Sequence, residues 1–98
     1  MNAAIAEHAG RIVGLVHFIL HRSTISIAPT CYLQDLFTLE DVRGKGVGRA
    51  LIEHVYEFAR RAACARVYWL THESNATARA LYDKVADNSG FIVYRKMI

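Results

Sequence analysis

A glycine-rich stretch, EDVRGKGVGRA at residues 40–50, has the residue types that bind an anion. Glycines lacking a Cβ let a backbone turn sharply and point several N–H groups outward. The following segment is predicted to be helical, and cations at a helix N-terminus oppose its dipole unless an anion lies between them. We therefore predict a pyrophosphate-binding loop, with about 1.5–3 kcal/mol from each charge-assisted bond. Its residues are Arg43, Gly44, Lys45, Gly46, Gly48 and Arg49.

Two common phosphate-binding motifs do not fit this loop. The dinucleotide motif G-x-G-x-x-G needs glycine where Arg49 or Leu51 stands. The P-loop needs Gly-Lys-Ser or Gly-Lys-Thr, and Lys45 is followed by glycine. The alternative interpretation is an ordinary glycine-rich turn with solvated cations.

Strands are predicted on the N-terminal side of the loop. Residues 3–8 and 11–21 are rich in apolar side chains and form a predicted hairpin, whose second strand is buried on both faces. Pro29 is expected in a turn-like stretch. Residues 32–39 alternate in polarity and predict a third strand, ending directly before the loop.

Helices and strands are predicted to alternate after the loop. A helix over residues 46–63 follows from apolar spacings of three and four, and residues 66–71 form a strand. Asn75 caps a second helix with Tyr82 on its inward side, and residues 91–98 form a last strand. The order β-β-β-α-β-α-β predicts an α/β (α+β) fold. Its sheet is mixed, mostly antiparallel and about five-stranded, with one parallel pair joined by a right-handed crossover.

Composition narrows the class of protein. The 98 residues are 53% hydrophobic and show no linker or repeat, which predicts one domain over residues 1–98. A net charge of +3 is too mild to indicate nucleic-acid binding. The two cysteines show neither metal spacing nor a disulfide framework, and the sequence has no membrane-spanning run and no signal-peptide start. These features favour a cytoplasmic protein that binds a small anionic ligand.

Three segments resemble the GNAT superfamily of acyl-CoA-dependent N-acetyltransferases. RGKGVG matches the signature R-x-x-G-x-G with Arg43, Gly46 and Gly48 at the defining positions. YLQDLFTLEDVRGKGVG resembles the family's fourth strand and pyrophosphate loop, and ESNATARALYDKV is similar to its second cofactor-contacting helix. VYWLTHESNATARALYDKVA especially resembles the branch that acetylates polyamines, histone tails and related amines. The resemblance implies transfer of an acetyl group from acetyl-CoA to a primary amine of a small molecule, a polyamine or a lysine side chain.

The resemblance also implies a binding site for acetyl-CoA or coenzyme A. Backbone groups of residues 36–38 would contact pantetheine in a cleft where strands 32–39 and 66–71 separate, and the loop would hold the pyrophosphate. The amine would attack the thioester directly, so Cys31 and Cys64 need no nucleophilic role, and no metal is implied. The implied cofactor-binding residues are Leu36, Phe37, Thr38, Arg43, Gly44, Lys45, Gly46, Val47, Gly48, Arg49 and Asn75.

Tyr82 is the implied general acid, because the family places a tyrosine of this helix beside the CoA sulfur. A phenol of pKa ~10 protonates a thiolate of pKa ~8.5 only uphill, by roughly 2 kcal/mol, so its main role would be a hydrogen bond to the leaving sulfur. The alternative is a core aromatic with a hydrated hydroxyl.

Asp35 is the predicted general base. It would share a strand face with Leu33 and Phe37, where burial favours the neutral acid. A structural carboxylate is an equal alternative, since many polyamine-acetylating relatives have a Glu-Asp pair where this chain has Gln34 and Asp35. His72 and Glu73 are further alternatives. His17 and His21 lie four apart and are expected to be ordinary sheet histidines, not a metal pair.

The resemblance covers roughly the C-terminal two-thirds of a standard GNAT domain. The strand and two helices that wall the acceptor side are not found before residue 11, and residues 86–98 leave room for one strand where the family commonly has a hairpin. Either the chain is a fragment of a longer domain, or a partner subunit completes the sheet and covers its exposed edge; of the two we predict a homodimer. The alternative function is a non-catalytic acyl-CoA-binding or interaction module. The acceptor amine stays open.

Overall fold

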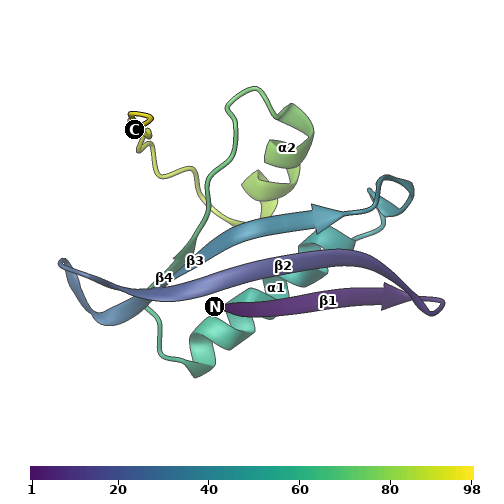
Figure 1. The fold of residues 1–98 in the computed structure, drawn as a ribbon, viewed down its shortest axis with the longest axis horizontal. Coiled ribbons are helices and arrows are strands. Elements are labelled where there is room, and N and C mark those ends of the chain that lie inside the picture. The colour runs from purple at the N-terminus through teal and green to yellow at the C-terminus, as the bar shows by residue number, and fades with distance from the viewer.

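A computed structural model describes residues 1–98 as a four-stranded sheet with two helices (Figure 1). The strands lie side by side in the order β1-β2-β3-β4. The first two pairings are antiparallel, and β3 pairs with β4 in parallel. The strands are β1 (Asn2–His8), β2 (Arg11–Ser23), β3 (Ser26–Thr38) and β4 (Arg66–Tyr68); the helices are the 3-10 helix η1 (Glu40–Val42), α1 (Val47–Arg61) and α2 (Ala76–Val85).

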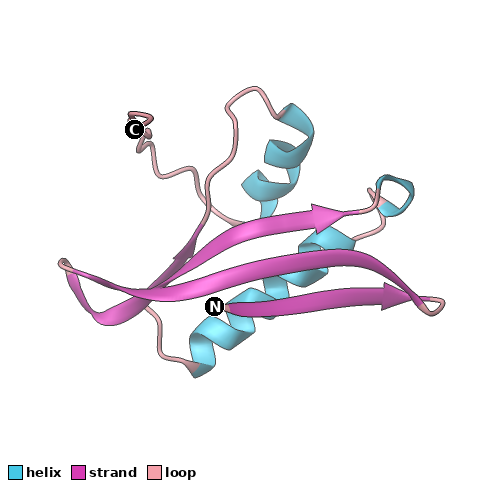
Figure 2. Cartoon of the chain, viewed as in Figure 1, coloured by secondary structure: helices cyan, strands magenta, loops and turns pink.

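Helix α1 packs on one face of the sheet and forms the core with it (Figure 2). Gly14 of β2 allows this packing, because a Cβ there would lie 2.9 Å from side-chain atoms of Val47 and Leu51. Farther along, Phe18 meets Phe58 edge to face with 4.9 Å between ring centroids. The buried cluster is Val16, Phe18, Cys31, Leu33, Leu51, Ile52, Val55 and Ala59.

The opposite face of the sheet has no helix over it. In β2, Val16 and Phe18 are buried against α1, whereas Leu15, His17 and Ile19 alternate with them and are only half-buried. The expectation that this strand is buried on both faces was therefore wrong. Its continuous apolar run reflects a covered face and a partly open face that are both rich in apolar side chains.

The predicted order of the first six elements, the long helix and the parallel β3–β4 pair are confirmed. The third strand is longer than predicted, however, because β3 begins at Ser26 and Pro29 lies within it. Proline is tolerated at this position because its carbonyl oxygen, which accepts from Ala65 N–H at 2.8 Å, is the group that is used. The predicted strand 66–71 is shorter, ending at Tyr68.

The predicted fifth strand over residues 91–98 was wrong. The chain forms no helix or strand after α2, and its C-terminal segment runs away from the sheet (Figure 1). A strand needs a neighbour to satisfy its backbone groups, and no strand of this chain pairs with the segment. The apolar side chains that suggested a buried strand are instead exposed: Phe91, Ile92, Val93, Tyr94, Met97 and Ile98.

Candidate active site

The glycine loop opens its backbone N–H groups to the surface at the start of α1. Gly44 and Gly46 adopt left-handed φ angles of 81° and 83°, and nothing lies within 4 Å of the position that a Cβ would take. Gly46 is the residue that precedes α1, and no side chain caps the N-terminus of this helix. No backbone carbonyl accepts from the N–H groups of residues 46–49. An oxyanion with several acceptor oxygens therefore fits this cradle, and a diphosphate is such a group.

The cations of the loop are exposed around this cradle. Arg43 and Lys45 form no ion pair, whereas Arg49 lies 3.8 Å from Glu53 one turn along α1. Asp41, at the start of the loop, instead accepts a hydrogen bond of 2.8 Å from Arg11. This guanidinium, with a smaller effect of Lys45, holds the pKa of Asp41 below its usual range. The two cations that form no ion pair favour anion binding.

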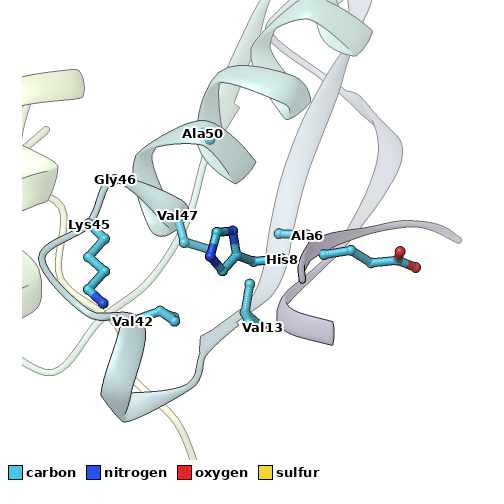
Figure 3. Close-up of a pocket in the computed structure, with 9 residues that line it drawn as sticks. Ala6, His8, Val13, Val42, Lys45, Gly46, Val47 and Ala50 are labelled. Carbon is cyan, nitrogen blue, oxygen red and sulfur yellow. The ribbon is translucent and has the colours of Figure 1, made fainter. Parts of the chain in front are cut away.

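A cavity of about 340 Å³ lies beside the loop, between it and the β1–β2 hairpin (Figure 3). Lys45, Gly46 and Val47 form one wall, and His8 projects toward Val47 from the hairpin. The remaining lining is Ala6, Glu7, Val13, Val42 and Ala50. This cavity borders the cradle from the sheet side and is separate from the cleft between β3 and β4.

The cleft implied by the resemblance would begin where β3 and β4 separate. Their register consists of three pairs and ends at Tyr32 opposite Tyr68, although β3 continues to Thr38. From Leu33 onward, the edge of β3 that faces away from β2 has no strand partner. The N–H and C=O groups of alternate residues reach this edge, because Leu39 N–H points to β2 and donates to Val13 O. Within residues 36–38 they are the groups of Leu36 and Thr38, and they lead directly to the glycine loop. The strand separation that the resemblance implied is therefore present.

Tyr82 lies at the α2 side of this cleft. Its ring meets Trp69, the first residue after β4, edge to face with centroids 5.3 Å apart. The hydroxyl forms no hydrogen bond within the protein, and burial raises the pKa of Tyr82. Tyr56 of α1 donates a hydrogen bond of 2.8 Å to Val85 O and so ties the end of α2 to α1. Tyr82 is thus a half-buried residue that packs against the core and has a free hydroxyl, which fits both the predicted donor role and the alternative of a core aromatic with a hydrated hydroxyl.

Asp35 was predicted to share a strand face with Leu33, and this prediction is wrong. A β-bulge separates them: Asp35 pairs with His17 and Leu33 pairs with Phe18, so Gln34 is an extra residue. Leu33 is buried against α1, whereas Asp35 lies on the opposite, open face with its side chain 59% exposed. The burial on which the predicted role depended is absent, and Asp35 Oδ2 contacts His17 Nδ1 at 3.4 Å instead.

Asn75 caps α2 as the sequence predicted, its Oδ1 accepting from Ala78 N–H at 3.3 Å. The predicted alternatives His72 and Glu73 are exposed in the loop before it. No three His, Cys, Asp or Glu side chains gather as a metal site would require. His17 and His21 have separate partners, Asp35 and the Tyr68 hydroxyl.

Sequence reasoning missed the aromatic residues at the inner end of the cleft. Tyr32 stacks on Tyr68, and the Tyr68 hydroxyl lies 2.7 Å from His21 Nε2. The signal that could have found them is the pairing of two predicted parallel strands, each with a tyrosine. It could not be used because a one-residue change of register would separate the two rings.

Comparison with known proteins decides the family. A model of the Acetyltransferase (GNAT) family matches residues 2–86. The chain belongs to the GNAT acetyltransferases. Among curated proteins it resembles the D-amino-acid N-acetyltransferase HPA3 of Saccharomyces cerevisiae, with 36% identity over 93 residues. The match covers 95% of this chain and 58% of the yeast protein, so this GNAT chain spans a little over half the length of that relative.

Solved structures share the fold of this GNAT chain. An aminoglycoside acetyltransferase from an uncultured soil metagenomic sample has a TM-score of 0.89 at 21% identity, covering 98% of this chain and 64% of that one. The ribosomal-protein-alanine N-acetyltransferase of Brucella melitensis has a TM-score of 0.86 at 22% identity, covering 98% and 70%. Neither helix of this chain has the length and apolarity that crossing a bilayer requires.

Proposed function

We propose that residues 1–98 form an acetyltransferase domain that transfers an acetyl group from acetyl-CoA to a primary amine. The observation that carries this proposal is the continuity of two free backbone surfaces. The unpaired N–H groups of residues 46–49 adjoin the open edge of β3, and Tyr82 lies on the other side of the same cleft. A diphosphate on the loop would direct an extended thioester arm along residues 36–38.

The bound thioester supplies an activated acyl carbon, and the chain positions it. Free N–H groups on β3 would hydrogen-bond the carbonyl oxygen as it gains negative charge, which stabilises the transition state more than the ground state. The Tyr82 hydroxyl would donate a hydrogen bond to the leaving sulfur. Because burial raises the pKa of Tyr82, the phenol keeps its proton at neutral pH and is available as a donor.

We propose an amine as the acceptor because the open face beside the cleft carries a carboxylate and aromatic rings. Asp35 is exposed there, and the stacked rings of Tyr32 and Tyr68 form the inner end of the cleft. Anionic and aromatic groups attract an ammonium ion. The related proteins act on D-amino acids and aminoglycosides by their names, and a small amine, polyamine or lysine side chain has the same nucleophile.

A non-catalytic acyl-CoA-binding module is a second candidate. It is favoured by the position of the 340 Å³ cavity, which adjoins the glycine loop but not Asp35. Two measurements separate these candidates. Calorimetry measures coenzyme A binding, and an assay of free thiol measures its release from acetyl-CoA with a panel of amines. Binding with amine-dependent thiol release is expected. Binding without release on any amine would favour the module, and no binding would contradict both candidates.

We further propose that the protein acts as a homodimer in the cytoplasm, where both cysteines would stay free as they are here. The C-terminal segment exposes six large apolar side chains. β4 is the last strand in the sheet order, so one of its edges has no strand partner. A second copy that pairs with this segment would cover both. Light scattering after size exclusion is expected to give a dimer for the wild type.

The matched variants for the dimer place the same charge in two exposed apolar positions. Val93→Lys puts a cation into the C-terminal segment, whereas Ile27→Lys puts one at the fully exposed start of β3. The first is expected to give monomers and the second to leave the dimer intact. A monomeric wild type would contradict the proposal.

A further inference from the structure

The side chains of His17 and Asp35 meet on the open face of the sheet. They stand opposite each other in the β2–β3 register, and His17 Nδ1 lies 3.4 Å from Asp35 Oδ2. Because Val16 and Phe18 on either side of His17 are buried against α1, its ring points to the other face. That ring is 34% exposed, so a molecule on the open face can reach it.

The pair also lies beside the cleft. Asp35 belongs to the part of β3 that follows Tyr32, where the opposite edge of the strand is free. Tyr82 packs with α1 and the core on the other face. A donor thioester lying along the free edge would therefore have a hydrogen-bond donor on one side of the sheet and an imidazole on the other. The acceptor would approach from the imidazole side (Figure 1, where α1 lies behind the sheet).

We propose that His17 is the base that accepts a proton from the acceptor amine, with Asp35 as the positioning residue for its ring. This inference rests on the proposed acetyltransferase function. The contact with Asp35 places the Nδ1 proton toward the carboxylate, which leaves the lone pair on Nε2 free for the substrate. The 3.4 Å separation is longer than a well-formed hydrogen bond, and such contacts commonly shorten when substrate binds.

Imidazole suits this task better than the carboxylate that was predicted for it. An ordinary carboxylate in water has a pKa near 4 and imidazole one near 6.5, whereas the ammonium has one of ~10. The stronger base takes the proton with the smaller uphill step. The residue opposite His17 on β1 is Ala3, so Asp35 is the charged side chain that faces it from the neighbouring strands. His21, four residues along β2, is engaged by Tyr68.

The proton and bond changes balance as follows. The ammonium gives one proton to His17 Nε2, and the neutral amine nitrogen forms a bond to the acyl carbon. The carbon–sulfur bond then breaks, the amide nitrogen releases its second proton to water, and the thiolate, which accepts a hydrogen bond from Tyr82, takes a proton from water. His17 returns its proton to water, so one proton is released for each amide formed.

The test compares two classes of acceptor with the same variants. Nα-acetyl-lysine, with an amine pKa of ~10.4, must lose a proton, whereas aniline is already neutral at pH 7. His17→Gln is expected to lower kcat/KM for the basic amine by about 10²-fold or more, and to leave aniline and coenzyme A affinity nearly unchanged. Asp35→Asn is expected to lower kcat/KM for the basic amine by roughly tenfold, less than loss of the base itself. His54→Gln, an exposed histidine of α1, is the matched control and should have no effect.

The possible results separate the inference from the proposed function. Wild-type turnover establishes the transferase, and a His17→Gln variant that retains full activity on the basic amine would then overturn the base alone. An equal loss on both acceptors would also overturn it, because it indicates a structural role. Wild type that binds coenzyme A but acetylates neither these two amines nor any other amine of the panel would overturn both. His17→Asn, with thermal melts of every variant, provides a second folded protein if His17→Gln is unstable.

Discussion

Tyr32 and Tyr68 stack with ring centroids 4.9 Å apart and planes 26° from parallel, at the last residue pair that joins β3 to β4. The Tyr68 hydroxyl also lies 2.7 Å from His21 Nε2. His21 Nδ1 lies 3.0 Å from the Arg22 carbonyl, which can only accept, so Nδ1 carries the proton and Nε2 accepts from Tyr68. The two tyrosines therefore fix the point at which the cleft opens.

Removing this support should lower both stability and turnover. Tyr68→Phe keeps the ring stack and loses one neutral hydrogen bond, so we expect the free energy of unfolding to fall by about 1 kcal/mol. Tyr68→Ala also loses the stack and should cost roughly 2–3 kcal/mol, less than a fully buried aromatic. Urea denaturation measures both. If Tyr68→Ala acetylated amines at the wild-type kcat/KM, the stack would have no part in positioning the cleft.

The glycine loop can be tested with two glycines of the same backbone conformation. Gly46 and Gly90 both have a φ of 83° and open space where a Cβ would be, but only Gly46 lies in the cradle. Alanine at either position should cost about 1–2 kcal/mol locally, because left-handed backbone is unfavourable with a side chain. Gly46→Ala should weaken coenzyme A binding at least tenfold, and a tenfold loss corresponds to about 1.4 kcal/mol. Gly90→Ala should not change the affinity. Calorimetry that gave equal affinities for both variants would contradict the diphosphate site.

Tyr82→Phe tests the hydrogen bond to the leaving sulfur. The ring and its contact with Trp69 remain, so we expect unchanged coenzyme A affinity and a kcat lowered by roughly 10-fold to 100-fold. Tyr94→Phe removes a hydroxyl from the exposed C-terminal segment and serves as the control. If Tyr82→Phe instead raised KM for acetyl-CoA and left kcat unchanged, Tyr82 would contribute to binding and not to the leaving-group step.

Cys31 predicts a dependence of stability on alkaline pH. Burial, with a smaller effect of nearby Cys64, raises the pKa of this thiol from 9.0 to about 11. Since the folded state holds the proton more tightly than the unfolded state, the stabilisation is complete below pH 9.0 and is lost as pH rises through about 11. In Cys31→Ala, the free energy of unfolding should therefore fall less steeply across this range than in the wild type.

The comparison for this prediction is Cys64→Ala, which removes a thiol that is only partly buried. Burial raises the pKa of Cys64 too, so this variant should change the slope in the same direction as Cys31→Ala. Burial also raises the pKa of Tyr56, Tyr68 and Tyr82, so some alkaline loss should persist in every variant. Chemical denaturation at closely spaced pH values gives the slopes. Identical slopes for Cys31→Ala and the wild type would show that the folded protein does not shift the titration of this thiol.

Local patterns predicted much of the fold. The apolar repeat of α1 and the Asn75 cap are short-range features, so they could be derived from sequence. The glycine loop combined a chemical signature with a place between a strand and a helix, and the positive φ angles of Gly44 and Gly46 agree with it. What failed depended on neighbours distant in sequence. Residues 91–98 have strand composition but no strand beside them, and β3 extends back to Ser26 because β2 pairs with it there.

The candidate site was predictable only where the backbone performs the task. Residues 36–38 and 43–49 contribute main-chain groups, and their places follow from strand and loop boundaries. Asp35 and His17 depend on which face each side chain occupies. Alternation through Leu33, Asp35 and Phe37 assumed an unbroken strand, and one unpaired residue at Gln34 reversed it.

The bulge at Gln34 places one extra residue between Leu33, which faces the interior, and Asp35, which faces solvent. Up to Leu33 the strand sends its apolar side chain into the protein interior, and after Gln34 it sends an acid outward while its backbone direction is unchanged. Deleting Gln34 would make Leu33 and Asp35 consecutive residues, and ordinary strand alternation would still send them to opposite faces, so the acid would stay outside and only the bulge would be lost. The bulge therefore lets the strand hold one additional polar residue while its interior and its solvent-facing side chains keep their places.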